Sequence, residues 1–300
     1  MTVIIPTLAS SERSVSLVRA VESIHEQEGL CKIIVVVNGN RRDLDVVSAL
    51  KRARDTRVLE LVEGDLVKAL TAGVEAVTTP YFSILDDDDH LMAGAARKRI
   101  DYMDRHPEAD VLVTPGQRQF MDGRTVRVPH LNGKDTIASL LDNNWLASCG
   151  GVFRRRSVGH DYFASMPRYL EWTYLAFQLA RERSVHFMMD DPFPHFTIVE
   201  TPSSESRSLE YSLAMPGALA QMQDPSLPLE IQRTLSRKVG AALHHAAGRC
   251  KKSGRMRDAW RFHLASLRKR DGMKYLLFTR HLLIGTLRLT RDKRGLDPVE

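Results

Sequence analysis

The chain has 300 residues, 43% of them hydrophobic and 27% charged, which is typical of a globular protein with a full buried core. Its three cysteines, Cys31, Cys149 and Cys250, lie far apart, which excludes a disulfide framework and a CxxC metal site. No basic segment followed by a long apolar one stands at the N-terminus, so we expect no signal peptide and a cytoplasmic protein.

Basic residues are concentrated at the end of the chain. Residues 231–300 hold 18 of the 43 Lys and Arg residues but only 5 of the 37 Asp and Glu residues. The rest of the chain has 25 basic and 32 acidic residues. An acidic body with a basic tail indicates two functions in two parts of the chain, although a solvated helical face would give the same charge.

In the first 91 residues, short apolar runs alternate with segments in which apolar residues recur at helical spacing. Short apolar runs predict strands in residues 2–7, 32–40, 57–64 and 81–85, and apolar spacing predicts helices in residues 11–27 and 66–77. This alternation predicts an α/β fold with a mostly parallel sheet and helices on both faces. Sheets of this kind bind ligands at the carboxyl ends of their strands.

Four consecutive aspartates, residues 86–89, follow the last of these strands. Adjacent anions repel one another, and Mg²⁺ or Mn²⁺ bound by carboxylates would relieve that repulsion and bridge the protein to substrate phosphates. A single Asp is enough to cap the next helix, so a metal site is favoured over a cap. The chain has no GxGxxG after its first strand and no GxxxxGK[ST], which argues against a dinucleotide fold and a P-loop NTPase.

The order of "VIIPT", "VVVNGN" and "ALTAGVEAVTTPYFSILDDDD" resembles the family 2 glycosyltransferases, which have the GT-A fold. The resemblance is clear over residues 2–91 and looser over residues 91–205. It implies transfer of a sugar from a nucleotide-diphosphate sugar to an acceptor hydroxyl, with inversion and with Mn²⁺ or Mg²⁺. It also implies a catalytic domain in residues 1–212, with a donor half at 1–91 and an acceptor half at 92–212, before a basic helical region at 213–300.

The same resemblance implies a donor site at the strand ends. Asp88 is the expected metal ligand, Asp86 and Asp87 are expected beside the ribose and diphosphate, and Asp89 is expected to cap a helix or to support the other three. The residues expected at the nucleotide are Pro6, Thr7, Asn38 and Lys68. Val37 and Thr71 replace an acidic residue and an Asn of the family pattern, so uracil, guanine and thymine bases all remain open.

Glu171 is the expected catalytic base. An inverting transfer needs a group that takes the proton of the acceptor hydroxyl while the diphosphate departs. The family carries an acidic pair before an aromatic residue at the start of a helix, and alignment on Trp172 puts Leu170 and Glu171 at that pair. The alternative role for Glu171 is to interact with the helix dipole.

Two later segments resemble the acceptor side of the family. The residues expected to border the acceptor are Trp145, Ser148, Cys149 and Gly150, although Trp145 suits the core equally well and Cys149 is expected to be packed rather than nucleophilic. His195 is expected to contact the metal or the diphosphate, or to be structural. Residues 203–208 are expected to form a loop that closes over the donor.

The basic tail is expected to form amphipathic helices on either side of "KKSGRM". The buried faces are expected at Ala242, Leu243, Ala246 and Ala247, and at Trp260, Leu264 and Leu267. Basic helices with an apolar face suit an anionic membrane, so we expect a peripheral protein on the inner face of the cell membrane with a saccharide or lipid-linked acceptor, in the assembly of a bacterial surface polysaccharide or glycolipid. The tail has no nucleic-acid motif, and we expect no nucleic-acid partner.

Two other functions stay open. A metal-dependent phosphohydrolase with an aspartyl nucleophile also has D-x-D after a strand. That class usually has Thr or Val two residues after the second Asp, and the corresponding residue of this chain, His90 or Leu91, does not fit. A non-catalytic adaptor on a degenerate transferase fold would explain the departures at Val37, Leu170 and Glu171. Loss of turnover in Asp88→Asn would distinguish an enzyme from an adaptor.

Overall fold

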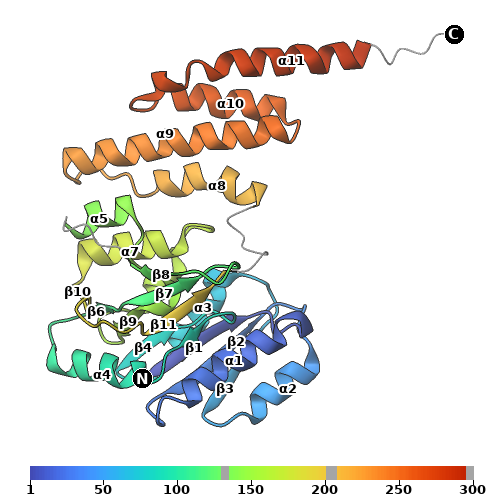
Figure 1. Cartoon of the computed structure of the whole chain (residues 1–300). Helices are drawn as coiled ribbons and strands as arrows, with labels where there is room; N and C mark the ends of the chain where they lie inside the picture. Colours follow the sequence, from blue (N-terminus) through green and yellow to red (C-terminus); the bar gives the residue numbers. More distant parts are fainter. Residues whose placement is uncertain (130–134, 201–207, 295–300) are drawn as a thin grey trace. The chain divides into compact units, whose positions relative to one another are not determined.

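Figure 1 shows the computed structural model, which describes residues 1–129, 135–200 and 208–294, with side chains up to residue 287. The chain forms two compact units. The first comprises Met1–Met166 with Glu171–Pro202, and the second comprises Pro167–Leu170 with Ser203–Glu300.

A seven-stranded sheet forms the centre of the first unit (Figure 1). Its strand order is β10-β6-β9-β4-β1-β2-β3. The strands are β1 (Thr2–Thr7), β2 (Lys32–Asn38), β3 (Thr56–Leu61), β4 (Tyr81–Ile84), β6 (Val111–Val113), β9 (Gly151–Arg154) and β10 (Val185–Phe187). The first four are mutually parallel, and β9 runs antiparallel to β4 and β6. The predicted mostly parallel α/β sheet is therefore confirmed.

The apolar runs of the sequence became strands because the sheet buries them. All six residues of β1 are buried, as are the five from Ile33 to Val37 in β2. Strands buried on both faces read as continuous apolar runs. The helices between the strands are α1 (Ser14–His25), α2 (Leu44–Arg52), α3 (Leu66–Glu75) and α4 (Ala95–Arg105), and a 3₁₀ turn, η1 (Ser11–Arg13), precedes α1.

A smaller four-stranded sheet follows the aspartates in the chain. Its order is β5-β11-β7-β8, from β5 (His90–Leu91), β11 (Phe196–Val199), β7 (Gly116–Gln119) and β8 (Thr125–Val128). The pairing of β5 with β11 brings the end of the first unit beside the aspartates. The remaining elements of this unit are α5 (Thr136–Asp142), the 3₁₀ turn η2 (Ser148–Gly150), α6 (Asp161–Ala164) and α7 (Glu171–Glu182).

The second unit is helical over its described residues. It contains α8 (Leu209–Ala220), α9 (Leu229–Lys252), α10 (Met256–Leu267), the 3₁₀ turn η4 (Gly272–Tyr275) and α11 (Phe278–Arg294). The expected domain boundary between residues 212 and 213 falls inside α8, so the helical unit begins earlier in the chain than expected. None of the helices in the described part of the chain combines the length and the apolar character that a bilayer span requires.

The two predicted tail helices are confirmed as α9 and α10, but the buried face of α10 is not the expected one. Helix α9 buries Leu243, Ala246 and Ala247 as predicted, with Ala242 half-buried. Helix α10 instead buries Ala259, His263 and Ser266, while Trp260 and Leu267 are half-buried and Leu264 is 49% exposed. The small residue Ala259 packs against Cys250 and Leu282, and this contact sets the inward face.

Candidate active site

The ends of three parallel strands meet at one edge of the central sheet, as predicted. Ile4 of β1 pairs with Ile84 of β4, and the amide of Leu85 donates to the carbonyl of Ile4 at 2.9 Å. Thr7 pairs with Val37, the residue before Asn38. The aspartates therefore begin where β1 and β2 end.

Asp87 is held on both of its carboxylate oxygens. The Thr7 hydroxyl donates to Oδ2 at 2.6 Å, and the Arg13 guanidinium forms an ion pair with Oδ1. The Asp87 side chain is almost fully buried. Arg13 also lies 3.8 Å from Oδ2 of Asp88. Thr7 and Arg13 therefore anchor the aspartate run to the end of β1 and to η1.

Within the run, Asp86 and Asp88 are half-buried, whereas Asp87 and Asp89 are buried. The Ser148 hydroxyl donates to Asp86 Oδ2 at 2.7 Å. Burial raises the pKa of Asp86 to about 6, with Asp88 and Asp87 adding to the rise against the Ser148 hydrogen bond. Burial and the Asp87 charge also raise the pKa of Asp88. Two oxygen donors whose charged forms are disfavoured are well suited to a divalent cation.

Asp89 supports the run and is not a helix cap. Helix α4 begins after Gly94, which has a positive φ of 74° and provides no side-chain cap. Asp89 instead accepts a 2.9 Å hydrogen bond from the amide of Val199, so it joins the run to β11. Burial, followed by the Asp86 charge, raises its pKa to about 8. Of the two roles expected for Asp89, capping is wrong, and support of the other three aspartates at a metal site stays a prediction.

A buried arginine, which the sequence analysis missed, holds the turn that carries Ser148. Arg99 of α4 donates 2.9 Å hydrogen bonds to the carbonyl of Cys149 and to the hydroxyl of Thr114. Its guanidinium lies 5.9 Å from the ring centroid of Phe196, and burial lowers its pKa to about 10. A signal was present in the sequence, because Arg99 shares a helical face with Ala95, Ala96 and Met103.

The expectation that Trp145 borders the acceptor is wrong. Its side chain is 1% exposed, so it offers no surface to a sugar ring. The indole N–H donates to the carbonyl of Thr136 at 2.9 Å, and the ring packs edge-on against Phe187. Trp145 is a core residue because both its apolar ring and its polar N–H find partners inside the protein.

Cys149 and Gly150 are also buried. Burial raises the pKa of the Cys149 thiol well above its usual value, which agrees with the expected packed, non-nucleophilic cysteine. A Cβ at Gly150 would lie 3.1 Å from the Phe196 ring. Both residues shape the Ser148 turn from within, while a direct contact with the acceptor stays a prediction.

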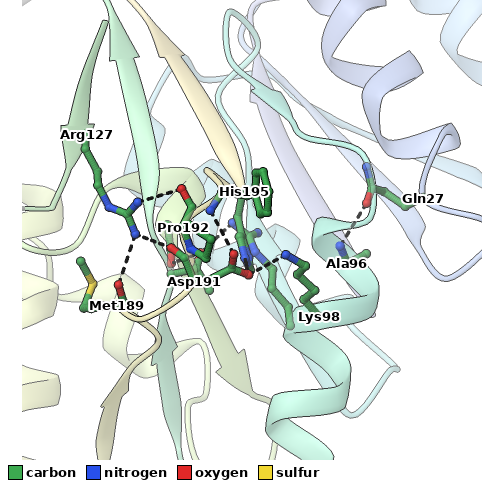
Figure 2. Close-up of polar contacts among 12 residues, drawn as sticks. Gln27, Ala96, Lys98, Arg127, Met189, Asp191, Pro192 and His195 are labelled. Carbon is green, nitrogen blue, oxygen red and sulfur yellow. Dashed lines mark hydrogen bonds and ion pairs between the residues drawn. The ribbon is translucent and has the colours of Figure 1, made fainter.

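His195 lies in a polar cluster around Asp191 (Figure 2). Its Nε2 is 3.0 Å from Asp191 Oδ2, which also accepts from Nζ of Lys98 at 2.7 Å. Arg127 of β8 donates to the carbonyls of Asp191, Pro192 and Met189 in the same segment. Nε2 of His195 is therefore engaged by Asp191, and a contact of His195 with a metal or with the diphosphate stays a prediction.

The other expected site residues are placed as follows. Pro6 is buried in β1, and Asn38 Oδ1 accepts from the amide of Asp65 at 2.7 Å. The ammonium of Lys68 pairs with Glu63. Glu171 is the first residue of α7, which confirms the expected position at a helix start. Their contacts with donor or acceptor stay predictions, and the expected loop at residues 203–208 lies outside the described residues except for Ser208.

The sequence profile described as Glycosyl transferase family 2 matches residues 2–163, more than half of the chain. The chain belongs to glycosyl transferase family 2. The matched range of this family 2 chain includes the four aspartates and the Ser148 turn, and it ends before Glu171.

Two known proteins similar to this family 2 chain come from staphylococci. It is 29% identical over 168 residues to a teichoic acid poly(glycerol phosphate) polymerase of Staphylococcus epidermidis, which covers 51% of this chain and 23% of the relative. The chain thus spans about a quarter of that relative's length. The crystal structure of S. aureus TarS 1–349 matches with a TM-score of 0.56 and 14% identity over 85% of this chain and 74% of that one. Its complex with UDP-GlcNAc matches with a TM-score of 0.58 and 14% identity over 82% and 72%. These likenesses confirm the GT-A fold.

Proposed function

We propose that the chain transfers a sugar, with inversion, from a nucleotide-diphosphate sugar to an acceptor hydroxyl during synthesis of a cell-wall polymer such as teichoic acid. The observation that carries the proposal is the pair of half-buried aspartates, Asp86 and Asp88, at the carboxyl edge of the sheet within the family match. The teichoic acid polymerase and the UDP-GlcNAc complex of TarS support the polymer class and the donor class.

Asp86 and Asp88 would hold Mn²⁺ or Mg²⁺, because their charges are disfavoured in the protein alone. When bound, such an ion neutralises the diphosphate and so favours its departure. The chain's own cations contribute nearby: Arg13 offsets the charge of Asp87 and Asp88, and Arg19 donates to the backbone carbonyl of Asp88 at 2.8 Å. These two arginines hold the run in place before any ion or donor arrives.

Glu171 is the proposed base. In an inverting transfer the acceptor oxygen forms its bond to the anomeric carbon as the diphosphate oxygen leaves, and a carboxylate takes the hydroxyl proton. The family resemblance puts the base at a helix start, where Glu171 lies. No covalent sugar–enzyme bond is required, which agrees with the buried Cys149 thiol, whose pKa burial raises well above its usual value.

The second unit is the proposed contact with an anionic membrane and a lipid-linked acceptor. The chain between η4 and α11 exposes large apolar side chains, with Leu277 85% exposed. Leu276, Leu283 and Ile284 are also exposed, and basic side chains stand among them at Lys274 and Arg280. Exposed apolar residues mixed with Lys and Arg are typical of helices that lie on anionic membranes.

Vesicle sedimentation tests this contact. We expect the chain to sediment with vesicles of anionic lipid and to stay in solution with neutral ones. Leu277→Ser should reduce the bound fraction several-fold, whereas Leu229→Ser, at another exposed leucine of the second unit, should leave it unchanged. Equal binding to neutral and anionic vesicles would contradict the electrostatic part of the proposal.

A thermal-shift panel of UDP-, GDP- and dTDP-sugars, with and without Mn²⁺, tests the donor site. Binding to the folded state raises the melting midpoint with ln(1 + [L]/Kd). We expect one nucleotide class to stabilise the protein only with metal, an effect lost in Asp88→Asn and retained in the control Asp45→Asn, at an exposed position of α2. Cooperative melting without a shift from any donor would contradict the proposal and favour the adaptor.

A further inference from the structure

Two histidines and a glutamate gather between α4 and the edge strand β10. His106 directly follows α4, Glu108 follows two residues later, and His186 is the middle residue of β10, where it pairs with Leu112 of β6. One donor atom from each of the three side chains lies within 4.8 Å of the others. We propose that His106, Glu108 and His186 bind a Zn²⁺ ion, at a site separate from the aspartates of the donor site.

The distances between the donor atoms suit one ion. Nδ1 of His106 is 3.0 Å from Oε1 of Glu108, and Nε2 of His186 is 3.9 Å from the same oxygen. Bonds of about 2.0–2.2 Å in a tetrahedral zinc site separate the donors by roughly 3.3 Å. The three donor pairs lie within about 1.5 Å of this spacing, so rotation of the partly exposed side chains is sufficient to bring the donor atoms onto one ion.

The chemistry of the donors selects the kind of metal. Two imidazole nitrogens and one carboxylate oxygen match the ligands that zinc takes in proteins, with a fourth position for water. Mg²⁺ and Mn²⁺ prefer a set of oxygens, such as the carboxylates of Asp86 and Asp88. The chain would thus distinguish its two metal sites by ligand type.

Tyr102 orients the ligands. Its hydroxyl lies 3.2 Å from Nδ1 of His186, the ring nitrogen that the metal would not use. A metal-binding histidine usually has its second nitrogen held by such a partner. The Tyr102 ring also lies against the His106 ring, with 4.2 Å between centroids. One residue of α4 therefore positions both imidazoles.

The proposed site is open to solvent and joins two distant segments. The side chains of His106, Glu108 and His186 are 37%, 56% and 24% exposed, so an ion can reach them. A bound ion would connect the end of α4 to β10, the outermost strand of the sheet. The chain after β10 leads to Asp191, which is already tied to Lys98 of α4 (Figure 2). The ion would thus add a second connection between α4 and this part of the chain.

Zinc titration of the full chain in the Asp88→Asn background tests the proposal while weakening the donor site. We expect one equivalent of Zn²⁺ to bind and to raise the melting midpoint. His106→Ala and Glu108→Gln should each weaken binding by roughly 100-fold or more, and Tyr102→Phe by about 10-fold. His160→Ala, at a partly exposed histidine beside Asp161, is the matched control and should bind as the parent does.

His186→Ala removes the third ligand, from a less exposed position in β10. If its melting midpoint without zinc is lowered, the exposed variants His106→Ala and Glu108→Gln decide the test alone. The proposal is overturned if the parent binds no zinc, or if these variants bind it as tightly as His160→Ala does. The cluster would then be an ordinary surface ion pair between histidine and glutamate.

Discussion

Ser148 and Asp86, 62 positions apart in the sequence, are joined by a 2.7 Å hydrogen bond from the serine hydroxyl to Oδ2 of the aspartate. The turn that carries Ser148 is held by Arg99 through the carbonyl of Cys149. The hydrogen bond favours the charged form of Asp86, whose pKa burial raises to about 6. Arg99 and Ser148 therefore position one of the two carboxylates proposed to hold the metal.

Ser148→Ala should lower transferase turnover about 10-fold. The substitution removes a hydrogen bond to a charged group, which contributes about 1.5–3 kcal/mol. With less support for its charged form, Asp86 should bind the metal more weakly, and a higher Mn²⁺ concentration should restore part of the activity. Sugar transfer measured against Mn²⁺ concentration checks this. Ser14→Ala, at a half-buried serine whose hydroxyl donates to the carbonyl of Ser11, is the control, and equal Mn²⁺ dependence in both variants would contradict the prediction.

The strand ends that form the site could be predicted from the sequence, because β1, β2 and β4 are continuous apolar runs followed by polar residues. The contact partners of Arg13 and Arg99 could not, because they lie 74 and 50 positions away, although the place of Arg99 on the apolar face of its helix was a signal for its burial. A local pattern carries no information on such pairs.

Two features of the helices were missed for different reasons. Helix α2 had a local signal that the sequence analysis did not use, since Asp43 before "LDVVSAL" accepts from the amides of Asp45 and Val46 as an N-cap. The inward face of α10 was misassigned because Leu264 is apolar yet exposed. Exposed leucines are common in folded proteins, so apolar character alone does not identify a buried face.

Arg13→Gln should destabilise the first unit by about 1–2 kcal/mol. Asp87 is buried, and the loss of Arg13 removes the ion pair on one of its two oxygens. The Thr7 hydroxyl still serves the other oxygen, and the partial exposure of Arg13 reduces the cost. Urea denaturation measures the change. Arg97→Gln breaks an exposed pair with Glu28 and should cost less than about 0.5 kcal/mol, so equal losses would contradict this explanation.

Gly73→Ala and Gly248→Ala should change stability in opposite directions, although both glycines lie inside helices. A Cβ at Gly73 would come within 2.5 Å of Cγ2 of Ile4, because α3 packs closely on β1 there. We expect a loss of about 1–3 kcal/mol from overpacking. A Cβ at Gly248 meets no atom within 4 Å, so the higher helix propensity of Ala should stabilise by about 0.5–1 kcal/mol. Thermal denaturation of the wild type and the two variants in the same buffer measures whether each substitution lowers or raises the stability.

The contribution of His195 to stability should fall as the pH falls from about 6.5 to 4, whereas Asp86 and Asp89, whose pKa values burial raises, act in the opposite direction. Its pKa is lowered to about 4, first by burial and then by the charge of Arg99, while Asp191 opposes the shift. Between these pH values the unfolded chain binds a proton at this position and the folded chain does not, so lowering the pH favours unfolding. The lowered pKa corresponds to about 2–3 kcal/mol at pH 4.

The variant His195→Gln isolates this contribution. It removes the titrating group and leaves Asp86 and Asp89 in place, so the free energy of unfolding of the wild type minus that of His195→Gln should fall by about 2–3 kcal/mol as the pH falls from 6.5 to 4. Asp191 contributes little to the pH dependence in this range. Burial would raise its pKa, but hydrogen bonds from Lys98 and His195 outweigh burial and hold its pKa below the usual value. Urea denaturation at half-unit pH steps measures both proteins. Parallel curves for the wild type and His195→Gln would mean that His195 titrates as an exposed histidine does, against its 1% exposure.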